Sequence, residues 1–325
     1  TRSGRIPAHS AILTDLVAWA DQIDGLATSG VSAEDLAGLL IHSRHLQSIA
    51  RAQQDAILPI LNGTGAAIID AAVNTLFDAA DTAADDAAMM AAIRHLRQRS
   101  GLATALADLA NKADVGTQMN WLSTAADAAI AATVRYLFRQ AAARGLVLPD
   151  CTGQRGCGWT ILALGKLGAS ELNYSSDVDM IILHDPDNNA LTNPETSQTF
   201  FVDLTRHLVS LLSSATRDGI GWRVDLRLRP DPGATAVSIQ REAAIGYYES
   251  IARTWERAAF IRARPVAGDI EMGSAFLADL QPFIWRCTLD FTVLDDMATM
   301  LSRPVASPGW TGFNLKLSLI HISEP

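Results

Sequence analysis

Cysteine is scarce in this sequence, and its three cysteines form no CxxC pair: Cys151, Cys157 and Cys287. They cannot all pair with one another, which argues against a disulfide scaffold and fits a reducing compartment. No apolar run approaches the roughly 20 residues of a membrane-crossing helix, and the N-terminal residues lack the layout of a signal peptide. We therefore expect a cytoplasmic protein with no membrane partner.

Basic residues are also in the minority, with 26 lysines and arginines against 35 acidic residues and a net charge of −9. Non-specific affinity for nucleic acid comes mainly from cations that meet phosphates, so this balance argues against a nucleic-acid partner. Aromatic residues make up only 6% of the chain, whereas hydrophobic residues make up 49%. That content excludes general disorder, and the 325 residues predict about two domains.

The first half of the chain has the pattern of successive helices. Apolar residues recur at steps of three and four through residues 11–150, which predicts helices that each pack through one face. Ser32, followed by Glu34 and Asp35, predicts a helix start. Residues 65–92 are rich in Ala and Asp, and fit either a thinly packed helical hairpin or a solvated surface segment.

The second half alternates candidate strands and helices. Short apolar runs at 159–165 and 178–185 predict buried strands, and strict alternation over 222–230 predicts a strand with one buried face. Helical spacing returns in three further segments, at 195–216, 246–263 and 273–300. We therefore expect a mainly helical α+β protein in which a small sheet domain is flanked by helical domains.

A DxD pair stands at the start of the second predicted strand. Residues two apart on a strand point to the same face, so Asp177 and Asp179 should lie side by side. Two adjacent carboxylates repel each other unless a cation lies between them, and Mg²⁺ prefers such oxygen ligands. The alternative is a pair of solvated acids at a strand edge.

The strand predicted over 222–230 supplies a third carboxylate. Asp225, Arg227 and Arg229 would share its polar face. If this strand pairs with the DxD strand, three acids could hold one or two metal ions, and the arginines could bind phosphate oxygens. The alternative is an exposed amphipathic strand with salt bridges.

Weaker signals surround these acids. Gly165 and Lys166 open a GKLG turn after the first predicted strand. Glycine there would let backbone amides approach a phosphate, and Lys166 could touch the phosphate or lie at the surface. Ser175 and Ser176 could donate hydroxyls to a phosphate or cap a short helix. Further along, Arg264 could reach the cleft or pair with a nearby acid.

Three stretches of the chain together resemble one known family: GKLGASELNYSSDVDMIILHD, VDLRLRPDPGATAVS and YYESIARTWERAAFIRARPVAGD. They are similar to the glutamine synthetase adenylyltransferase/adenylyl-removing enzymes, which belong to the polymerase-β-like nucleotidyltransferases. The resemblance spans roughly residues 90–317. NYSSDVDMI and VDLRLRP look like the N-terminal, adenylyl-removing half of that family. The resemblance implies a polymerase-β-like sheet domain and an enzyme that uses Mg²⁺.

By this resemblance, the chain removes AMP from adenylylated glutamine synthetase by phosphorolysis, with phosphate consumed and ADP released. The family's catalytic, metal-binding carboxylates match Asp177, Asp179 and Asp225. Its phosphate-side loop matches Gly165, Lys166, Ser175 and Ser176, and the arginines after its third acid match Arg227 and Arg229. The partners that the resemblance implies are glutamine synthetase, a PII-type signal protein, the nucleotides ADP and ATP, and phosphate.

Two alternatives remain open: ATP-dependent adenylylation of glutamine synthetase, and an impaired fragment that only binds glutamine synthetase or its signal protein. Residues 318–325 do not resemble the family, so we expect a truncated chain with a non-family tail. The expected organisation is an N-terminal helical region at 1–150, a catalytic domain at 151–270, and the start of a C-terminal helical domain at 271–317.

Overall fold

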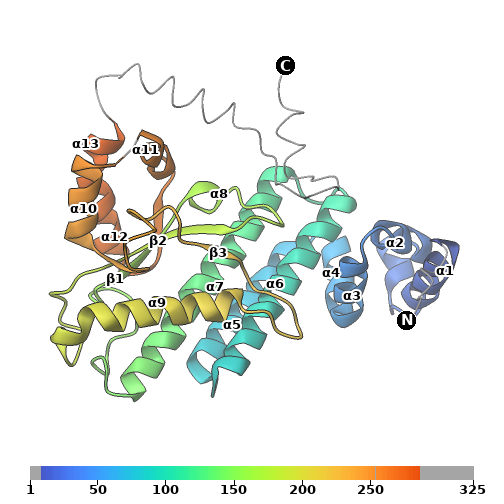
Figure 1. The fold of residues 1–325 in the computed structure, drawn as a ribbon. Helices are drawn as coiled ribbons and strands as arrows, with labels where there is room; N and C mark the ends of the chain where they lie inside the picture. The colour runs from blue at the N-terminus through green and yellow to red at the C-terminus, as the bar shows by residue number, and fades with distance from the viewer. Residues whose placement is uncertain (1–8, 253, 286–325) are drawn as a thin grey trace, which may run out of the picture.

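The computed structural model describes residues 9–252 and 254–285. Its N-terminal part is a series of helices (Figure 1): α1 His9–Ala20, α2 Ala33–Leu40, α3 Arg44–Ala52, α4 Ile57–Leu61, α5 Gly65–Thr82, α6 Asp86–Leu109 and α7 Val115–Ala143. Two 3₁₀ turns lie among them, at Leu26–Ser29 and Gln54–Ala56. The predicted succession of helices is confirmed.

Side-chain caps fix where several of these helices begin. The Ser32 hydroxyl accepts a hydrogen bond from the backbone of Asp35, and the Asp35 carboxylate accepts one from the backbone of Ser32. This capping box confirms the predicted helix start at Ser32. Asp85 and Asp114 accept backbone hydrogen bonds in the same way at the starts of α6 and α7.

Residues 65–92 form a packed helical hairpin rather than a solvated surface segment. α5 and α6 lie against each other and both also contact α7. Leu76 of α5 and Leu96 of α6 are fully buried in the core that these helices share with the sheet. A separate core, which includes the fully buried Leu36, holds α1–α4 against the other ends of α5 and α6.

The described residues form a five-stranded sheet: β1 Trp159–Ala163, β2 Val178–His184, β3 Val224–Asp225, β4 Ile239–Gln240 and β5 Arg264–Gly268. The order is β3–β2–β1–β5, and β4 pairs with the far end of β2. β1 runs antiparallel to β2 and β5, whereas β3 and β4 run parallel to β2. The strands predicted at 159–165 and 178–185 are confirmed.

Helices cover both faces of β1 and β2, which explains why most residues of these strands are apolar. Ile161 and Met180 face the core of α5–α7 and α9, whereas Leu162 and Leu183 face α10, α12 and α13. Figure 1 shows the sheet between these two groups. The remaining helices are α8 Gly165–Gly168, α9 Ser197–Ser213, α10 Arg241–Ser250, α11 Thr254–Phe260, α12 Ile270–Asp279 and α13 Gln281–Ile284, and a 3₁₀ turn covers Pro194–Thr196.

Two predicted elements are wrong in part. The strand expected over 222–230 ends at Asp225, because the backbone N–H of Arg227 donates to the Asp225 carboxylate at 2.8 Å and the chain turns. Arg227 and Arg229 therefore do not share a strand face with Asp225. The helix expected over 246–263 is divided into α10 and α11, and β5 follows it directly.

The mainly helical α+β class is confirmed. No helix in residues 9–252 or 254–285 is long and apolar enough to cross a membrane. Most of the segment expected at 271–317, from residue 286 onward, lies outside the described residues, as does the tail at 318–325. The domain boundaries and the polymerase-β-like kinship of the sheet stay predictions.

Candidate functional site

Strand pairing brings the predicted acids together. Asp179 and Asp225 are register partners in the parallel pair β2–β3, so their side chains leave the sheet on the same face. Asp177 stands directly before β2, two positions from Asp179. Asp177 and Asp225 line a cleft of about 460 Å³. The structure therefore pairs the DxD strand with the segment that carries the third acid.

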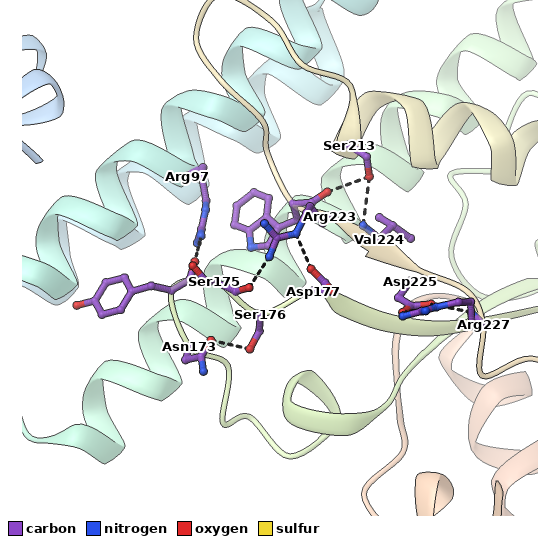
Figure 2. A network of polar contacts seen from close by, with 12 residues as sticks. Arg97, Asn173, Ser175, Ser176, Asp177, Ser213, Arg223, Val224, Asp225 and Arg227 are labelled. Carbon is purple, nitrogen blue, oxygen red and sulfur yellow. Dashed lines mark hydrogen bonds and ion pairs between the residues drawn. The ribbon is translucent and has the colours of Figure 1, made fainter. Parts of the chain in front are cut away.

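Two arginines face these carboxylates (Figure 2). The Arg227 guanidinium donates to both oxygens of Asp225 and holds the pKa of that carboxyl below its usual range. Asp225 in turn raises the pKa of Arg227, and Asp177 and Asp179 add to this effect at longer range. Arg223 donates to Asp177 at 2.5 Å. The cleft is thus lined by two carboxylates, Asp177 and Asp225, together with Arg223 and Arg227, and Asp179 lies next to Asp225 in the strand register.

The loop 173–176, which leads into the DxD pair, is held from two sides. Arg223 donates to the carbonyl of Ser175 at 2.5 Å, and Arg97 of α6 donates to the carbonyl of Tyr174 at 2.5 Å. The Ser176 hydroxyl donates to the side chain of Asn173 at 2.6 Å. Ser175 and Ser176 therefore lie beside Asp177 in a loop that is tied to the helical region (Figure 2).

The GKLG turn lies against Asp179. Gly165 adopts φ +56°, and a Cβ there would lie 2.6 Å from a carboxylate oxygen of Asp179, so this position favours glycine. Lys166 is exposed on the same turn. The structure thus places Gly165 at the acid site and leaves the Lys166 side chain in reach of solvent.

Arg264 of β5 holds the other end of this turn. It donates to the carbonyls of Leu167 and Gly168 at 2.9 and 3.2 Å. It also pairs with Asp127 of α7 at 2.8 Å. Burial raises the pKa of Asp127, and Arg264 opposes that shift. The sequence left two roles open for Arg264, reaching the cleft or pairing with an acid, and the structure shows the ion pair with Asp127.

Arg229 lines the cleft, but its guanidinium is used inside its own loop. It donates to the carbonyls of Leu226 and Pro232 at 2.8 Å each, and also to those of Thr235 and Ala236. In this structure Arg229 therefore holds the turn that follows β3. Its predicted contact with phosphate stays a prediction.

The three carboxylates suit Mg²⁺ by their chemistry, since it is a hard cation that prefers oxygen ligands. Strand register also puts Asp179 next to Asp225. Within the described ranges, however, no three His, Cys, Asp or Glu side chains gather closely enough to hold a metal ion. Asp177 and Asp225 are turned to Arg223 and Arg227 instead, so metal binding requires these arginines to move.

Sequence analysis missed Arg223 and Arg97. Alternation along residues 222–230 puts Arg223 on the same face as Asp225, so a signal for it was present. Nothing local marks Arg97, because it reaches Tyr174 from 77 residues away. Contacts of that separation become visible only once the helices are packed.

Fold and site together define a mainly helical α+β protein whose small sheet carries a cleft of acids and arginines. Such clefts are typical of enzymes that transfer phosphate-bearing groups. The family described as glutamate-ammonia ligase adenylyltransferase matches residues 33–279. The chain belongs to this family of nucleotidyltransferases, which confirms the resemblance found in its motifs.

Several curated relatives carry the name bifunctional glutamine synthetase adenylyltransferase/adenylyl-removing enzyme. The one from Xanthobacter autotrophicus is 41% identical over 312 residues, which cover 93% of this chain and 31% of the relative. The one from Rhizobium meliloti is 38% identical over 330 residues, or 98% and 34%. The one from Bradyrhizobium diazoefficiens is 39% identical over 281 residues, or 86% and 28%. The chain thus spans about a third of the length of these relatives.

Proposed function

We propose that this chain removes AMP from adenylylated glutamine synthetase by phosphorolysis, as a cytoplasmic enzyme of nitrogen assimilation. The observation that carries the proposal is the pairing of Asp179 with Asp225, which adds a third carboxylate beside Asp177. Family membership and the relatives' names support the substrate. The likeness of NYSSDVDMI and VDLRLRP to the adenylyl-removing half of the family favours removal of AMP over its transfer.

Asp177, Asp179 and Asp225 would hold Mg²⁺, which when bound neutralises charge on the α-phosphate. An oxygen of inorganic phosphate attacks the α-phosphorus, the bond from phosphorus to the tyrosine oxygen breaks, and ADP forms. The tyrosine oxygen then takes a proton from solvent. A phenol with a free pKa near about 10 leaves more easily than an aliphatic alkoxide, so no protein nucleophile is required.

The arginines and the two loops would position the phosphates. Arg227 is 82% exposed at its side chain, so it has the freedom to exchange Asp225 for a phosphate oxygen. Lys166, Ser175 and Ser176 flank the acids and would supply further donors, and Gly165 lets the backbone approach closely. Such transfers depend on alignment and electrostatics more than on covalent chemistry by the protein.

Two other functions are alternatives for this chain. The three acids would serve equally for transfer of AMP from ATP to glutamine synthetase, because the reaction at the α-phosphate is the same type. A chain that spans about a third of its relatives could also bind glutamine synthetase or a PII-type signal protein without catalysis. Both are therefore tested beside the main proposal.

The decisive experiment follows ADP release from adenylylated glutamine synthetase in the presence of Mg²⁺ and phosphate. Asp225→Asn should lower the rate by at least about 100-fold, since it removes a charge that holds the metal at the reacting phosphate. Asp203→Asn is the matched control, because Asp203 lies exposed on α9 and pairs only with Arg206 among the described residues. It should leave the rate unchanged.

The other outcomes separate the alternatives. AMP transfer from ATP to unmodified glutamine synthetase, without ADP release from the modified enzyme, would establish the adenylylating activity. If a folded chain catalyses neither reaction but still binds glutamine synthetase, only the binding role remains. Equal ADP release by the wild-type chain and Asp225→Asn would refute the carboxylate site itself.

A further inference from the structure

A second pocket lies behind the loop 174–176, on the side toward α6 and α3. It has a volume of about 310 Å³ and lies between these helices and residues 218–223. Arg223 lines both this pocket and the carboxylate cleft, so it forms part of the wall between them. Figure 2 shows Arg97 and Arg223 reaching the same loop from different elements.

The charged groups that line this pocket are mostly cationic. Among the described residues they are Arg94 and Arg97 of α6 and Arg223, against the carboxylate of Asp218, and His45 of α3 also lines the pocket. His45 and Asp218 are both exposed to solvent, where the field of a charge is screened. Arg94 is buried and Arg97 is half-buried, so the inner part of the pocket is positive, whereas Arg223 is exposed.

Two of these cations are held by hydrogen bonds to backbone carbonyls rather than by ion pairs, although the nearby charge of Asp218 favours the charged form of Arg94. Arg94 is 1% exposed and donates to the carbonyls of Leu211 and Ser214 at 2.5 Å each, at the end of α9. The Arg97 guanidinium stacks on the ring of Trp222 at 5.3 Å and donates to the carbonyl of Tyr174. Neither forms an ion pair with a carboxylate in the described part of the chain.

The pKa of Arg97 is lowered, as expected for a half-buried cation that lies beside another cation. Burial lowers the pKa of Arg97, and the neighbouring charge of Arg223 lowers it further. Burial likewise lowers the pKa of Arg94. An anion between the two side chains of Arg97 and Arg223 would relieve both the repulsion and the loss of hydration.

We propose that this pocket binds a phosphate dianion through the guanidinium groups of Arg97 and Arg223. A guanidinium carries five N–H donors, and the bond to Tyr174 uses one of those of Arg97. Phosphate is favoured because its oxygens match the fork of two N–H groups on arginine. The dianion is either free phosphate or the terminal phosphate of a nucleotide.

Phosphate in this pocket changes the carboxylate cleft through the shared arginine. Arg223 now donates to Asp177 at 2.5 Å, and a dianion competes with that carboxylate for the same guanidinium. Binding therefore draws Arg223 from Asp177 and frees an oxygen ligand for Mg²⁺. Only this consequence rests on the proposed function, because the binding step itself needs neither glutamine synthetase nor metal.

The first test is calorimetric titration of the metal-free chain with inorganic phosphate. Arg97→Gln should weaken binding by about tenfold or more, the effect of losing one charged donor pair. Arg206→Gln removes the same charge from an exposed site on α9 and should change binding less than twofold. Unchanged phosphate binding in Arg97→Gln would overturn the proposal.

A second test uses the wild-type chain alone, so it holds even if a variant fails to fold. Phenylglyoxal modifies accessible arginines, and mass spectrometry locates the modified residues. Phosphate should protect Arg97 and Arg223 severalfold and leave Arg206 unprotected. Stronger protection by ADP than by phosphate would identify a nucleotide as the source of the dianion, and absence of protection by both would refute the site. If the chain fails to release ADP from modified glutamine synthetase but phosphate still protects these arginines, the proposed function is wrong and the phosphate site stands.

Discussion

Gly165 lies where β1 passes into α8, with its backbone in a left-handed conformation and Asp179 against its open side. We predict that Gly165→Ala lowers the free energy of unfolding by about 1–2 kcal/mol, because alanine is strained at φ +56° and its Cβ would displace Asp179. Gly38→Ala is the control: it lies within α2 with no atom within 4 Å of the added Cβ, and should stabilise the chain by about 0.5–1 kcal/mol. Urea denaturation measures both. Equal effects of the two changes would contradict the role of this turn.

His184, at the end of β2, predicts a pH dependence of stability. The ring is fully buried, stacks on Phe201 and hydrogen-bonds Ser238 at 2.9 Å, and burial lowers its pKa to about 4. Between that pKa and the usual value near about 6.5, the unfolded chain binds a proton that the folded chain does not, so stability falls as the pH falls. From pH ~7.5 to ~5 the loss due to this group is about 2 kcal/mol.

Substitution isolates that contribution from the other titrating groups. His184→Gln should lose about 2 kcal/mol less than the wild-type chain between pH ~7.5 and ~5, although packing losses make it less stable at the higher pH. Urea denaturation at the two pH values gives the difference. An unchanged pH dependence in the variant would show that His184 takes up its proton in the folded chain as readily as in the unfolded chain.

Among the helices and strands, those whose residues are buried on every side are predicted best from sequence. β1 and β2 are covered on both faces, so most of their residues are apolar and the strands are evident from composition alone. The alternation over 222–230 misleads because its apolar residues do not share a face. Leu226 packs on the core of α5–α7, whereas Leu228 packs on the core of α10–α13. β5 is missed because Pro265 and Gly268 are weak strand formers.

The ion pair of Arg264 with Asp127 joins β5 to α7 and holds the GKLG turn. We predict that Arg264→Gln costs about 2 kcal/mol, because it leaves a half-buried carboxylate and two backbone carbonyls without their donor. Arg262→Gln, two residues away, breaks an exposed pair with Glu171 and should cost less than about 0.5 kcal/mol. Thermal denaturation of the two variants compares them directly. Similar costs would mean that the Arg264 pair is screened by water like a surface pair.

For the whole molecule, the position of the site follows from one core shared by helices and sheet. Side chains of α5–α7 and of one face of β1 and β2 pack into the same core. Hydrogen bonds from Arg97 and Arg264 connect this packed region to the loops beside the acids. The three acids themselves could be predicted from sequence because each is defined by neighbours along the chain. Arg97 could not, and the acid that pairs with Arg264 could not be identified, because their partners are 77 and 137 residues away.

A shared core predicts that helices and sheet lose stability together. Leu96 of α6 and Leu36 of α2 are both fully buried, the first in the core that includes β1 and β2 and the second in the core of α1–α4. Each change to alanine should cost about 2–5 kcal/mol locally. Leu96→Ala should speed hydrogen exchange at the amides of β1 and β2, whereas Leu36→Ala should speed it chiefly in α1–α4. If Leu96→Ala left the exchange of β1 and β2 unchanged, the helical region and the sheet would be independent units, and Arg97 could not hold the acid site through packing.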